Sequence, residues 1–317
     1  MWARLCVLRA FTAANPPAPP SQVSSLHPQA TSLYAPLRGH TGTVRCVRFS
    51  PPSLMPLSSS SPSPPPTYIA SAGAGDFKAR LWDVTQQALI TAFQPHSCTV
   101  TGLTWLDQQT FLSADESGYI VGNDVRAPSP AWSFGLSGYS VCTLALLMDP
   151  LQGGPLGPGD WLNYYGQSVH GGGGGGAATG RSSLIVAGCA GGAVCVFDCR
   201  SGKVMASDKC GHSDDVRGVA VLPPVALDQS AAAGAGAGLP TFATSSFDGT
   251  TSIWEIGQRG ALTQICVLSG VHSDKVLGCA FVPKTQSIVT TGADGAVVVW
   301  SPGGGGEGGR CQDKGGR

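Results

Sequence analysis

The chain repeats one structural unit, and the copy at 268–300 shows it without interruption. In this copy His272 precedes a short apolar alternation at 276–281, which predicts a half-buried β-strand. Two more strands are predicted at 288–291 and 296–300, and the Gly-Ala-Asp-Gly sequence between them predicts a tight hairpin turn. Such units must stack on one another, because a small sheet needs neighbours to bury its apolar faces.

Four unequal copies of this unit precede it. The first opens with Gly39-His40, continues with a predicted strand at 44–49 and closes with Trp82-Asp83. The third lacks the histidine and ends in Phe197, where the other complete units have tryptophan. The second, third and fourth copies begin at His96, Tyr139 and His212.

Three long inserts disguise the repeat. They lie at 52–67, 149–181 and 224–240 and consist largely of Ser, Pro, Gly and Ala. With the inserts removed, successive units start 40–43 residues apart, which is within the range of roughly 40–45 residues for one propeller blade. Segments of this composition bury too little apolar surface to fold. All three fall between the first and second strands of a unit. In the repeat family that these units resemble, this connection lies on the face opposite the histidine loops, so the resemblance implies that the histidine face is free of inserts.

Gly-His followed by Trp-Asp, with a strand, a turn and a strand between them, resembles the WD-repeat β-propellers. The resemblance implies an all-β propeller with five recognisable four-stranded blades over 31–301. A truncated seven-bladed ring is the alternative. The segment at 31–37 is predicted to add the fourth strand to the last blade and so remove an open sheet edge. Disordered tails are predicted at 1–30 and 302–317.

The resemblance also implies a hydrogen-bonded tetrad of His, Ser or Thr, Asp and Trp inside each blade. In the second unit His96 and Ser113 are kept, while Ser117 is predicted at the aspartate position and Asn123 at the tryptophan position. The third unit keeps none of the four. The complete predicted tetrads are His40, Ser71, Asp76 and Trp82; His212, Thr244, Asp248 and Trp254; and His272, Thr290, Asp294 and Trp300.

The same residues argue against an enzyme. A catalytic triad occurs once in a cleft, whereas this constellation repeats at blade spacing. The glycine runs at 171–176 and 303–306 follow no strand and open no helix, so they are not phosphate loops. Cys195 and Cys199 lie on one strand face and are predicted to pack there rather than bind metal. No catalytic residue, metal or cofactor is therefore predicted.

Composition limits the partners and the compartment. The chain has 19 basic and 19 acidic residues, a balance that predicts neither a nucleic-acid nor a membrane partner. Its eleven cysteines are scattered without CxxC pairs, which favours a reducing compartment, the cytoplasm or the nucleus. The acid-free segment at 1–30 contains two arginines. Its alternative interpretation is a transit peptide for import into an organelle.

The leading functional hypothesis is a non-catalytic scaffold that docks a protein or peptide on the insert-free face. A second hypothesis is a substrate receptor of a cullin–RING ubiquitin ligase. The Asp-x-Arg sequence at two unit ends resembles the Trp-Asp-x-Arg of such receptors. Arg126 and Arg200 would then contact the adaptor. An enzyme is the least favoured class. Family geometry predicts that the partner-binding residues are Thr43, Thr99, Asp214, Asp215, Phe247, Asp274 and Lys275.

Overall fold

A computed structural model describes residues 36–51, 67–147, 184–199, 201–222, 241–256 and 261–301. The predicted tails, nearly all of the three inserts and Arg200 lie outside the described residues. The chain divides into two compact units, Met1–Pro36 and Leu37–Arg317, and every described strand belongs to the second.

The described strands form five antiparallel sheets, called blades 1 to 5 in chain order. Blade 1 contains β1 (Val44–Phe49), β2 (Tyr68–Gly73), β3 (Ala79–Asp83) and β4 (Ala88–Phe93). Blade 2 contains β5 (Val100–Trp105), β6 (Thr110–Asp115), β7 (Tyr119–Asp124) and β8 (Pro130–Gly135). Blade 3 contains β9 (Val141–Leu147), β10 (Leu184–Cys189), β11 (Val194–Asp198) and β12 (Val204–Asp208), with the 3₁₀ turn Ala190–Gly192 after β10. Blade 4 contains β13 (Val216–Leu222), β14 (Thr241–Ser246), β15 (Thr251–Ile256) and β16 (Leu262–Leu268), and blade 5 contains β17 (Val276–Val282), β18 (Ser287–Gly292) and β19 (Val297–Trp300).

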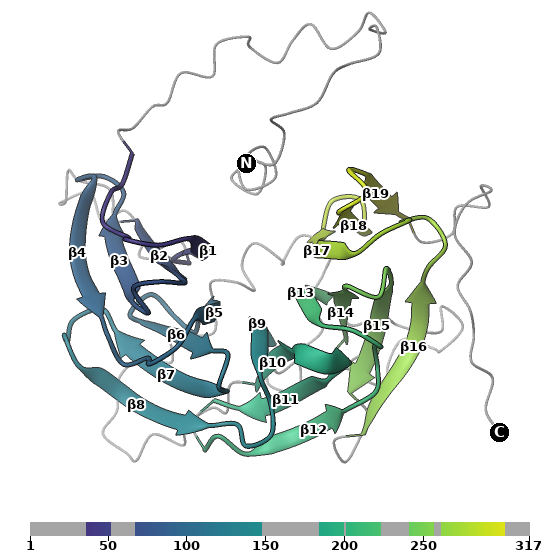
Figure 1. Cartoon of the computed structure of the whole chain (residues 1–317), viewed down its shortest axis with the longest axis horizontal. Coiled ribbons are helices and arrows are strands. Elements are labelled where there is room, and N and C mark those ends of the chain that lie inside the picture. The colour runs from purple at the N-terminus through teal and green to yellow at the C-terminus, as the bar shows by residue number, and fades with distance from the viewer. Residues whose placement is uncertain are drawn as a thin grey trace, which may run out of the picture. The chain divides into compact units, whose positions relative to one another are not determined.

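The blades follow one another around a central axis, with β1, β5, β9, β13 and β17 innermost (Figure 1). Each innermost strand contacts the innermost strand of the next blade in the series. The predicted all-β propeller with five blades is therefore confirmed. Blade 5 has three strands within the described ranges. The fourth strand at 31–37 stays a prediction, because 31–35 lie outside the described residues and Pro36 and Leu37 are not part of a strand.

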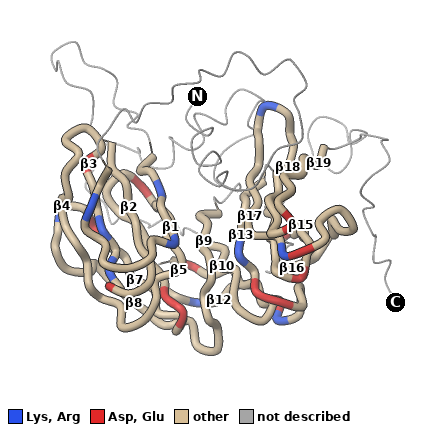
Figure 2. Tube along the Cα trace, turned by 45° about the horizontal axis from the view of Figure 1, so that its top comes forward, with Lys and Arg blue, Asp and Glu red and all other residues tan. Residues whose placement is uncertain are grey.

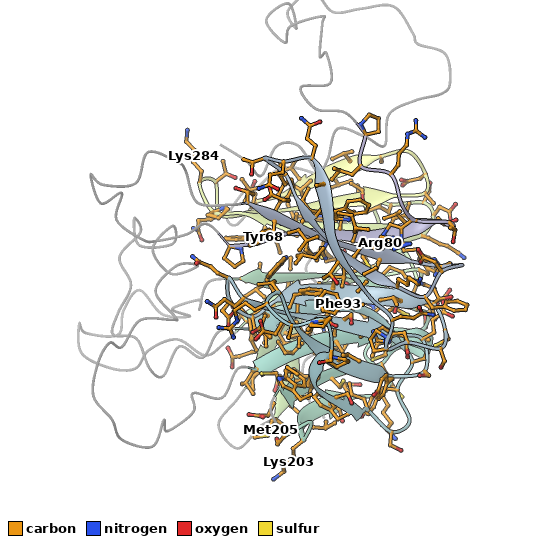
Figure 3. The ribbon with its side chains drawn as sticks, turned by 90° about the vertical axis from the view of Figure 1, so that its left-hand side faces the viewer. Tyr68, Arg80, Phe93, Lys203, Met205 and Lys284 are labelled. Atoms are coloured by element: carbon orange, nitrogen blue, oxygen red, sulfur yellow. The ribbon has the colours of Figure 1, made fainter. Side chains whose placement is uncertain are left out.

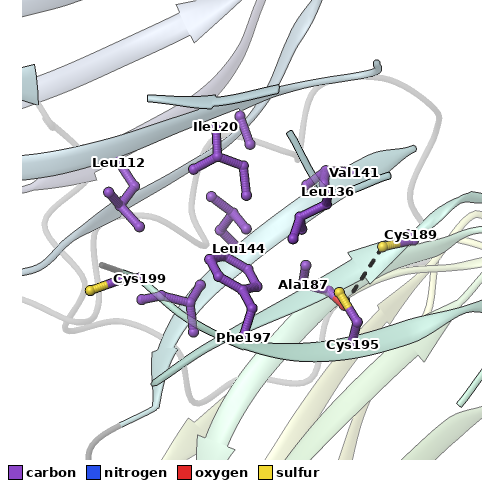
Figure 4. Packing of buried hydrophobic residues seen from close by; sticks show 12 residues of the cluster. Leu112, Ile120, Leu136, Val141, Leu144, Ala187, Cys189, Cys195, Phe197 and Cys199 are labelled. Carbon is purple, nitrogen blue, oxygen red and sulfur yellow. Dashed lines mark hydrogen bonds between the residues drawn. The ribbon is translucent and has the colours of Figure 1, made fainter. Parts of the chain in front are cut away.

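The core lies between the blades. Leu112 and Ile120 of blade 2 pack with Leu144 and Phe197 of blade 3, and all four side chains are fully buried (Figure 4). Burying each such side chain contributes about 1.5–3 kcal/mol relative to leaving it in water. The middle blades are covered on both faces in this way, and their inner strands β5, β6 and β10 are buried at nearly every position.

The two ends of the blade series expose side chains that are buried elsewhere. Every innermost strand begins with Val, which is fully buried in four blades but 45% exposed at Val44 of β1. At the other end Val299 of β19, which precedes Trp300, is 61% exposed. Its counterpart in blade 3 is Val196, which precedes Phe197 and is 0% exposed. Val297 is exposed as well. We call the surface around Val297 and Val299 the blade 5 end face.

The propeller has two rims, and they carry different connections. The histidine-bearing loops lead into the first residues of the innermost strands, whereas the inserts follow their last residues. In an edge-on view Tyr68 and Lys284, next to first-to-second-strand connections, lie on one side and Arg80 lies on the other (Figure 3). Arg80 donates to the carbonyl oxygen of Gly39, beside the first histidine, at 2.7 Å. We call these two sides the insert rim and the histidine rim.

Candidate functional site

A hydrogen-bonded chain ties each histidine loop to the turn of its own blade. In blade 4, His212 Nδ1 lies 3.0 Å from Asp248 Oδ2, and His212 Nε2 lies 2.8 Å from Thr244 Oγ1. Trp254 Nε1 donates to the same Thr244 oxygen at 2.7 Å. Asp248 also accepts the backbone N–H groups of Ser213 and Thr250. One carboxylate thus satisfies donors from both the loop and the hairpin turn.

Blades 1 and 5 contain the same chain of contacts. His40 lies 2.8 Å from both Asp76 and Ser71, and the Trp82 indole donates to Ser71 at 2.7 Å. In blade 5 the corresponding partners are again within hydrogen-bonding distance. They are His272, Thr290, Asp294 and Trp300. The structure thus brings together the members of all three tetrads named from the sequence.

Blade 2 has a tetrad too, and the prediction of Ser117 at its aspartate position is wrong. His96 Nδ1 lies 2.8 Å from Asp115 Oδ2 and its Nε2 lies 2.7 Å from Ser113 Oγ. Asn123 replaces the tryptophan and donates to Ser113 at 2.9 Å. Asp115 accepts the backbone N–H of Ser117, just as Asp248 accepts the backbone N–H of Thr250. The aspartate therefore sits at the end of β6, before the turn instead of inside it.

The tetrad aspartates are held in the ionised form. Burial would raise the pKa of Asp248, but the hydrogen bonds from His212, Thr250 and Ser213 outweigh burial and hold that pKa well below its usual range. Burial lowers the pKa of His96, and Asp115 only partly opposes the shift. These groups are occupied by partners within their blades, which gives them a structural role.

A second feature shared by all blades is a β-bulge at the second residue of the innermost strand. The first and third residues of that strand have partners on the neighbouring strand, while the residue between them has none. A bulge of this kind turns its side chain out of the regular alternation of the sheet. The five bulge residues are Arg45, Thr101, Cys142, Arg217 and Leu277.

All five bulge residues line one central cavity of about 580 Å³. Arg48 and Leu103, farther along two of the innermost strands, add to its wall, and Phe247 from the β14–β15 turn borders it as well. Each bulge residue follows its histidine loop by a few positions, so the cavity opens at the histidine rim. We take this cavity and its mouth as the candidate functional site.

Comparison with known proteins agrees with this geometry. The family model described as "WD domain, G-beta repeat" matches residues 31–83 and 263–301, which span most of blades 1 and 5. Together with the five blades and their tetrads, this match decides the family. The chain belongs to the WD-repeat β-propellers. The family resemblance read from the sequence is thus confirmed.

Two curated relatives share part of this WD-repeat propeller. The chain is 26% identical over 147 residues to "DDB1- and CUL4-associated factor 10" of Homo sapiens, and equally to the protein of that name from Mus musculus. The match covers 46% of the chain but only 23% of each relative. The chain thus spans less than a quarter of the relatives it matches.

The residues predicted to bind a partner lie at the histidine rim of the propeller. The carbonyl groups of Thr43, Thr99, Asp215 and Lys275 each accept an N–H from the hairpin turn of the same blade. Each of these residues directly precedes the first Val of an innermost strand. The bulge residues, which the sequence-based prediction missed, lie only two positions farther along. Asp214 is partly buried, whereas Asp274 is exposed.

Phe247 is held between two cations. Its ring centroid lies 4.8 Å from the guanidinium carbon of Arg217 and 4.6 Å from the Lys275 amine, and its side chain is partly buried. Cation–π contacts of this geometry contribute about 0.5–2 kcal/mol. Its N–H donates to the carbonyl of Asp215, whose carboxylate binds Arg217 at 2.6 Å. Phe247 therefore helps to fix a bulge arginine at the cavity mouth.

Arg126 lies elsewhere, in the β7–β8 connection of blade 2, which antiparallel strand order places at the insert rim. Its side chain is 64% exposed and folds back onto Asp124, with Nη2 2.6 Å from Oδ2. The hydrogen bonds from Arg126 lower the pKa of Asp124. Arg200, the second predicted adaptor contact, lies outside the described residues.

Two features of the described ranges bear on function. Nowhere in them do three or more His, Cys, Asp or Glu side chains gather in a way that could hold a metal ion. Cys195 and Cys199 are buried thiols in the core between blades 2 and 3. The same ranges contain no helix of the length and apolarity that crossing a membrane requires.

Proposed function

We propose that this propeller is a non-catalytic scaffold that docks a protein or peptide partner at the mouth of its central cavity, on the histidine rim. The observation that carries the proposal is the set of five bulges, which aim one side chain from every blade into the same cavity. Bulges are frequent where a sheet must re-aim a side chain toward a bound molecule. WD-repeat propellers generally act as protein-interaction scaffolds, which agrees with this role.

The arrangement of the rims supports the choice of face. The inserts follow the ends of β1, β9 and β13, opposite the histidine loops. A large partner can therefore approach the histidine rim over short, ordered loops. The predicted binding residues and the bulge residues share this rim, so a partner that reaches one set reaches the other.

The chemistry of the cavity supports binding rather than catalysis. No Asp, Glu or His is among the described residues that line it, so these residues offer no pair of groups for general acid–base work. The histidines and aspartates of the tetrads are already bonded within their blades. The wall instead combines arginine, threonine and apolar side chains, a mixture common at protein interfaces.

The test is a partner-binding measurement on the full chain. Proximity labelling in the native cell would identify the partner and its compartment, which we expect to be the cytoplasm or nucleus; organellar neighbours would favour the transit-peptide interpretation of 1–30. With that partner purified, Phe247→Ala is expected to weaken binding at least tenfold, since central aromatic anchors typically contribute about 2 kcal/mol or more.

The matched control is deletion of 149–181, which belongs to the opposite rim. This deletion should leave the dissociation constant within about twofold. If the deletion abolishes binding while Phe247→Ala has no effect, the working face has been assigned to the wrong rim.

A second candidate function is a substrate receptor of a cullin–RING ubiquitin ligase. The similarity to the relatives named DDB1- and CUL4-associated factor 10 favours it, as does the exposed Asp124–Arg126 pair on the insert rim. Under this hypothesis, replacing both Arg126 and Arg200 by Ala should remove the ligase core from a pull-down. Retention of the ligase core by the double variant, or its absence from the wild-type pull-down, would leave the simple scaffold as the better account.

A further inference from the structure

Among the described residues that line the central cavity, the charged side chains are all arginines. Arg45 and Arg48 come from β1, and Arg217 comes from β13, three blades farther along the series. Figure 2 shows basic positions on both of these innermost strands. Asp215 and Glu116 pair with Arg217 and Arg45, so the three arginines exceed the carboxylates that contact them by one charge. Such a cavity attracts anions, because low-dielectric walls focus the field of its cations.

Two of the arginines have only weak partners. Arg45 lies 3.3 Å from Glu116, and both side chains of this pair are almost half exposed. Exposed ion pairs contribute little, so a ligand can displace this contact. Arg48 donates to the backbone carbonyl of its neighbour Val47. Both guanidinium groups can therefore turn toward an anion in the cavity at little cost.

Arg217 is held in place and keeps one donor unused. Its Nη2 binds Asp215 at 2.6 Å and its guanidinium stacks on Phe247. Its Nε is buried and has no hydrogen-bond partner among the described residues. Arg217 is thus positioned before the ligand arrives.

The remaining wall fits the aliphatic part of a peptide. Leu103, Leu277 and the ring of Phe247 border the same cavity as the arginines. A volume of about 580 Å³ is larger than a single side chain needs, and it lies within the range of roughly 300–1,000 Å³ that is typical of ligand pockets. Arginine pairs with carboxylates through two parallel hydrogen bonds, which gives direction as well as affinity.

From these contacts we infer that the cavity binds an acidic peptide segment of the partner, with an Asp or Glu carboxylate lying between Arg217 and the two arginines of β1. The inference rests on the proposed scaffold function and specifies the chemistry of its partner. The peptide backbone lies against Phe247 and Leu277 at the rim. An anion of another kind, a phosphorylated side chain, is an outcome that the test below distinguishes.

The test uses the full chain and capped, fluorescein-labelled hexapeptides. Hexaglutamate and hexaglutamine are the probes, and fluorescence anisotropy measures their binding at low and moderate salt. Hexaglutamate is expected to bind at least tenfold more tightly than hexaglutamine. Arg217→Gln and Arg48→Gln should each weaken the binding at least threefold, whereas the control variant Arg126→Gln, on the other rim, should not change it.

Several outcomes would overturn the inference. Equal binding of the two peptides, or an equal loss with Arg126→Gln, would mean that charge acts without this site. If a phosphoserine peptide of the same formal charge binds tenfold more tightly than hexaglutamate, the natural ligand is a phosphate and not a carboxylate. Thermal melts confirm that the variants fold; if Arg217→Gln does not, Arg217→Lys keeps the charge and should still weaken the binding.

Failure of this inference differs from failure of the scaffold. If the partner still requires Phe247 but is indifferent to Arg217→Gln and Arg48→Gln, the scaffold stands and the acidic segment is wrong. If Phe247→Ala and the arginine variants all leave the partner bound, the proposed face itself is wrong.

Discussion

Val196 and Val299 occupy equivalent positions in blades 3 and 5, and their burial predicts very different sensitivities to truncation. Each directly precedes the aromatic residue of its strand, Phe197 in β11 and Trp300 in β19. Val196 is 0% exposed within a cluster that includes Phe242 and Trp254, whereas Val299 is 61% exposed. Replacement by Ala removes the same two methyl groups at both positions. The comparison therefore isolates the effect of a neighbouring blade.

The expected magnitudes follow from this burial. At about 0.8 kcal/mol for each buried carbon, plus a penalty for the cavity left behind, Val196→Ala should cost about 2–3 kcal/mol. Val299→Ala leaves no enclosed cavity and loses less than half of the transfer contribution, about 0.6 kcal/mol. The lower β-propensity of Ala affects both variants alike. The free energies of unfolding should therefore differ by about 1.4–2.4 kcal/mol.

Urea denaturation followed by circular dichroism measures both values under identical conditions. The pair Val194→Ala and Val297→Ala provides an independent repeat, because these positions are also buried in blade 3 and exposed in blade 5. If Val299→Ala costs as much as Val196→Ala, the blade 5 end face is covered in solution, and the reasoning from exposure fails.

Three more predictions concern single groups. Asp115→Asn should lower the free energy of unfolding by about 2 kcal/mol, since it weakens charged hydrogen bonds, whereas Ser117→Ala should cost about 0.5 kcal/mol; thermal melts compare them. The pKa of Asp248 is lowered on folding, so its carboxylate stabilises the fold above about pH 4, the pKa in the unfolded chain. This stabilisation is lost as the pH falls toward the pKa in the folded chain. The difference in melting temperature between wild type and Asp248→Asn should therefore shrink in acid. Burial raises the pKa of Cys46 to about 12, while Cys210 is exposed. A thiol reagent at pH 8 should therefore label Cys210 quickly and Cys46 only after denaturation. Peptide mass spectrometry would measure both.

The fold could be predicted because its signals repeat. A single His or Asp says little, but five units at one spacing define both the blades and the strands that carry them. The tetrads of blades 1, 4 and 5 could be located by the same comparison, since their histidine, hydroxyl and aspartate recur in the same order. The ends of the blade series carried no such signal, because burial of Val44 or Val299 depends on a neighbour that local sequence does not specify.

The mistake at Ser117 has a local physical cause. Counting back from the end of a strand assumes that the aspartate has the same position in every hairpin. The hairpins of blades 2 and 4 have equal length, since five residues separate the paired Ala114 and Ile120 and five separate the paired Ser245 and Thr251. Asp115 is the first of its five residues, whereas Asp248 is the third of its own. The carboxylate of Asp115 still reaches the histidine, because it lies at the end of its strand. The geometry of the hydrogen bonds is thus kept while the position in the sequence shifts.

The bulge residues were missed for a different reason. A pattern of alternating faces has a period of two, and a bulge inserts one residue that the pattern cannot accommodate. A signal was present: Val-x-Gly begins the innermost strand in blades 2, 4 and 5, with glycines at Gly102, Gly218 and Gly278. Glycine inside a strand often marks a bulge. Reading these glycines as bulge markers would have placed Arg217 and its counterparts at the cavity.

The contrast between two neighbouring positions explains why function belongs at the bulges. The first residue of every innermost strand is Val, and in blades 2, 3 and 4 it packs against the preceding blade. The next residue is Arg, Thr, Cys, Arg or Leu, depending on the blade. Its side chain faces the cavity, where packing imposes no single choice. The repeats can therefore differ at this position without any cost to the fold, and the order of side chains around the cavity can be set by the molecule that binds there.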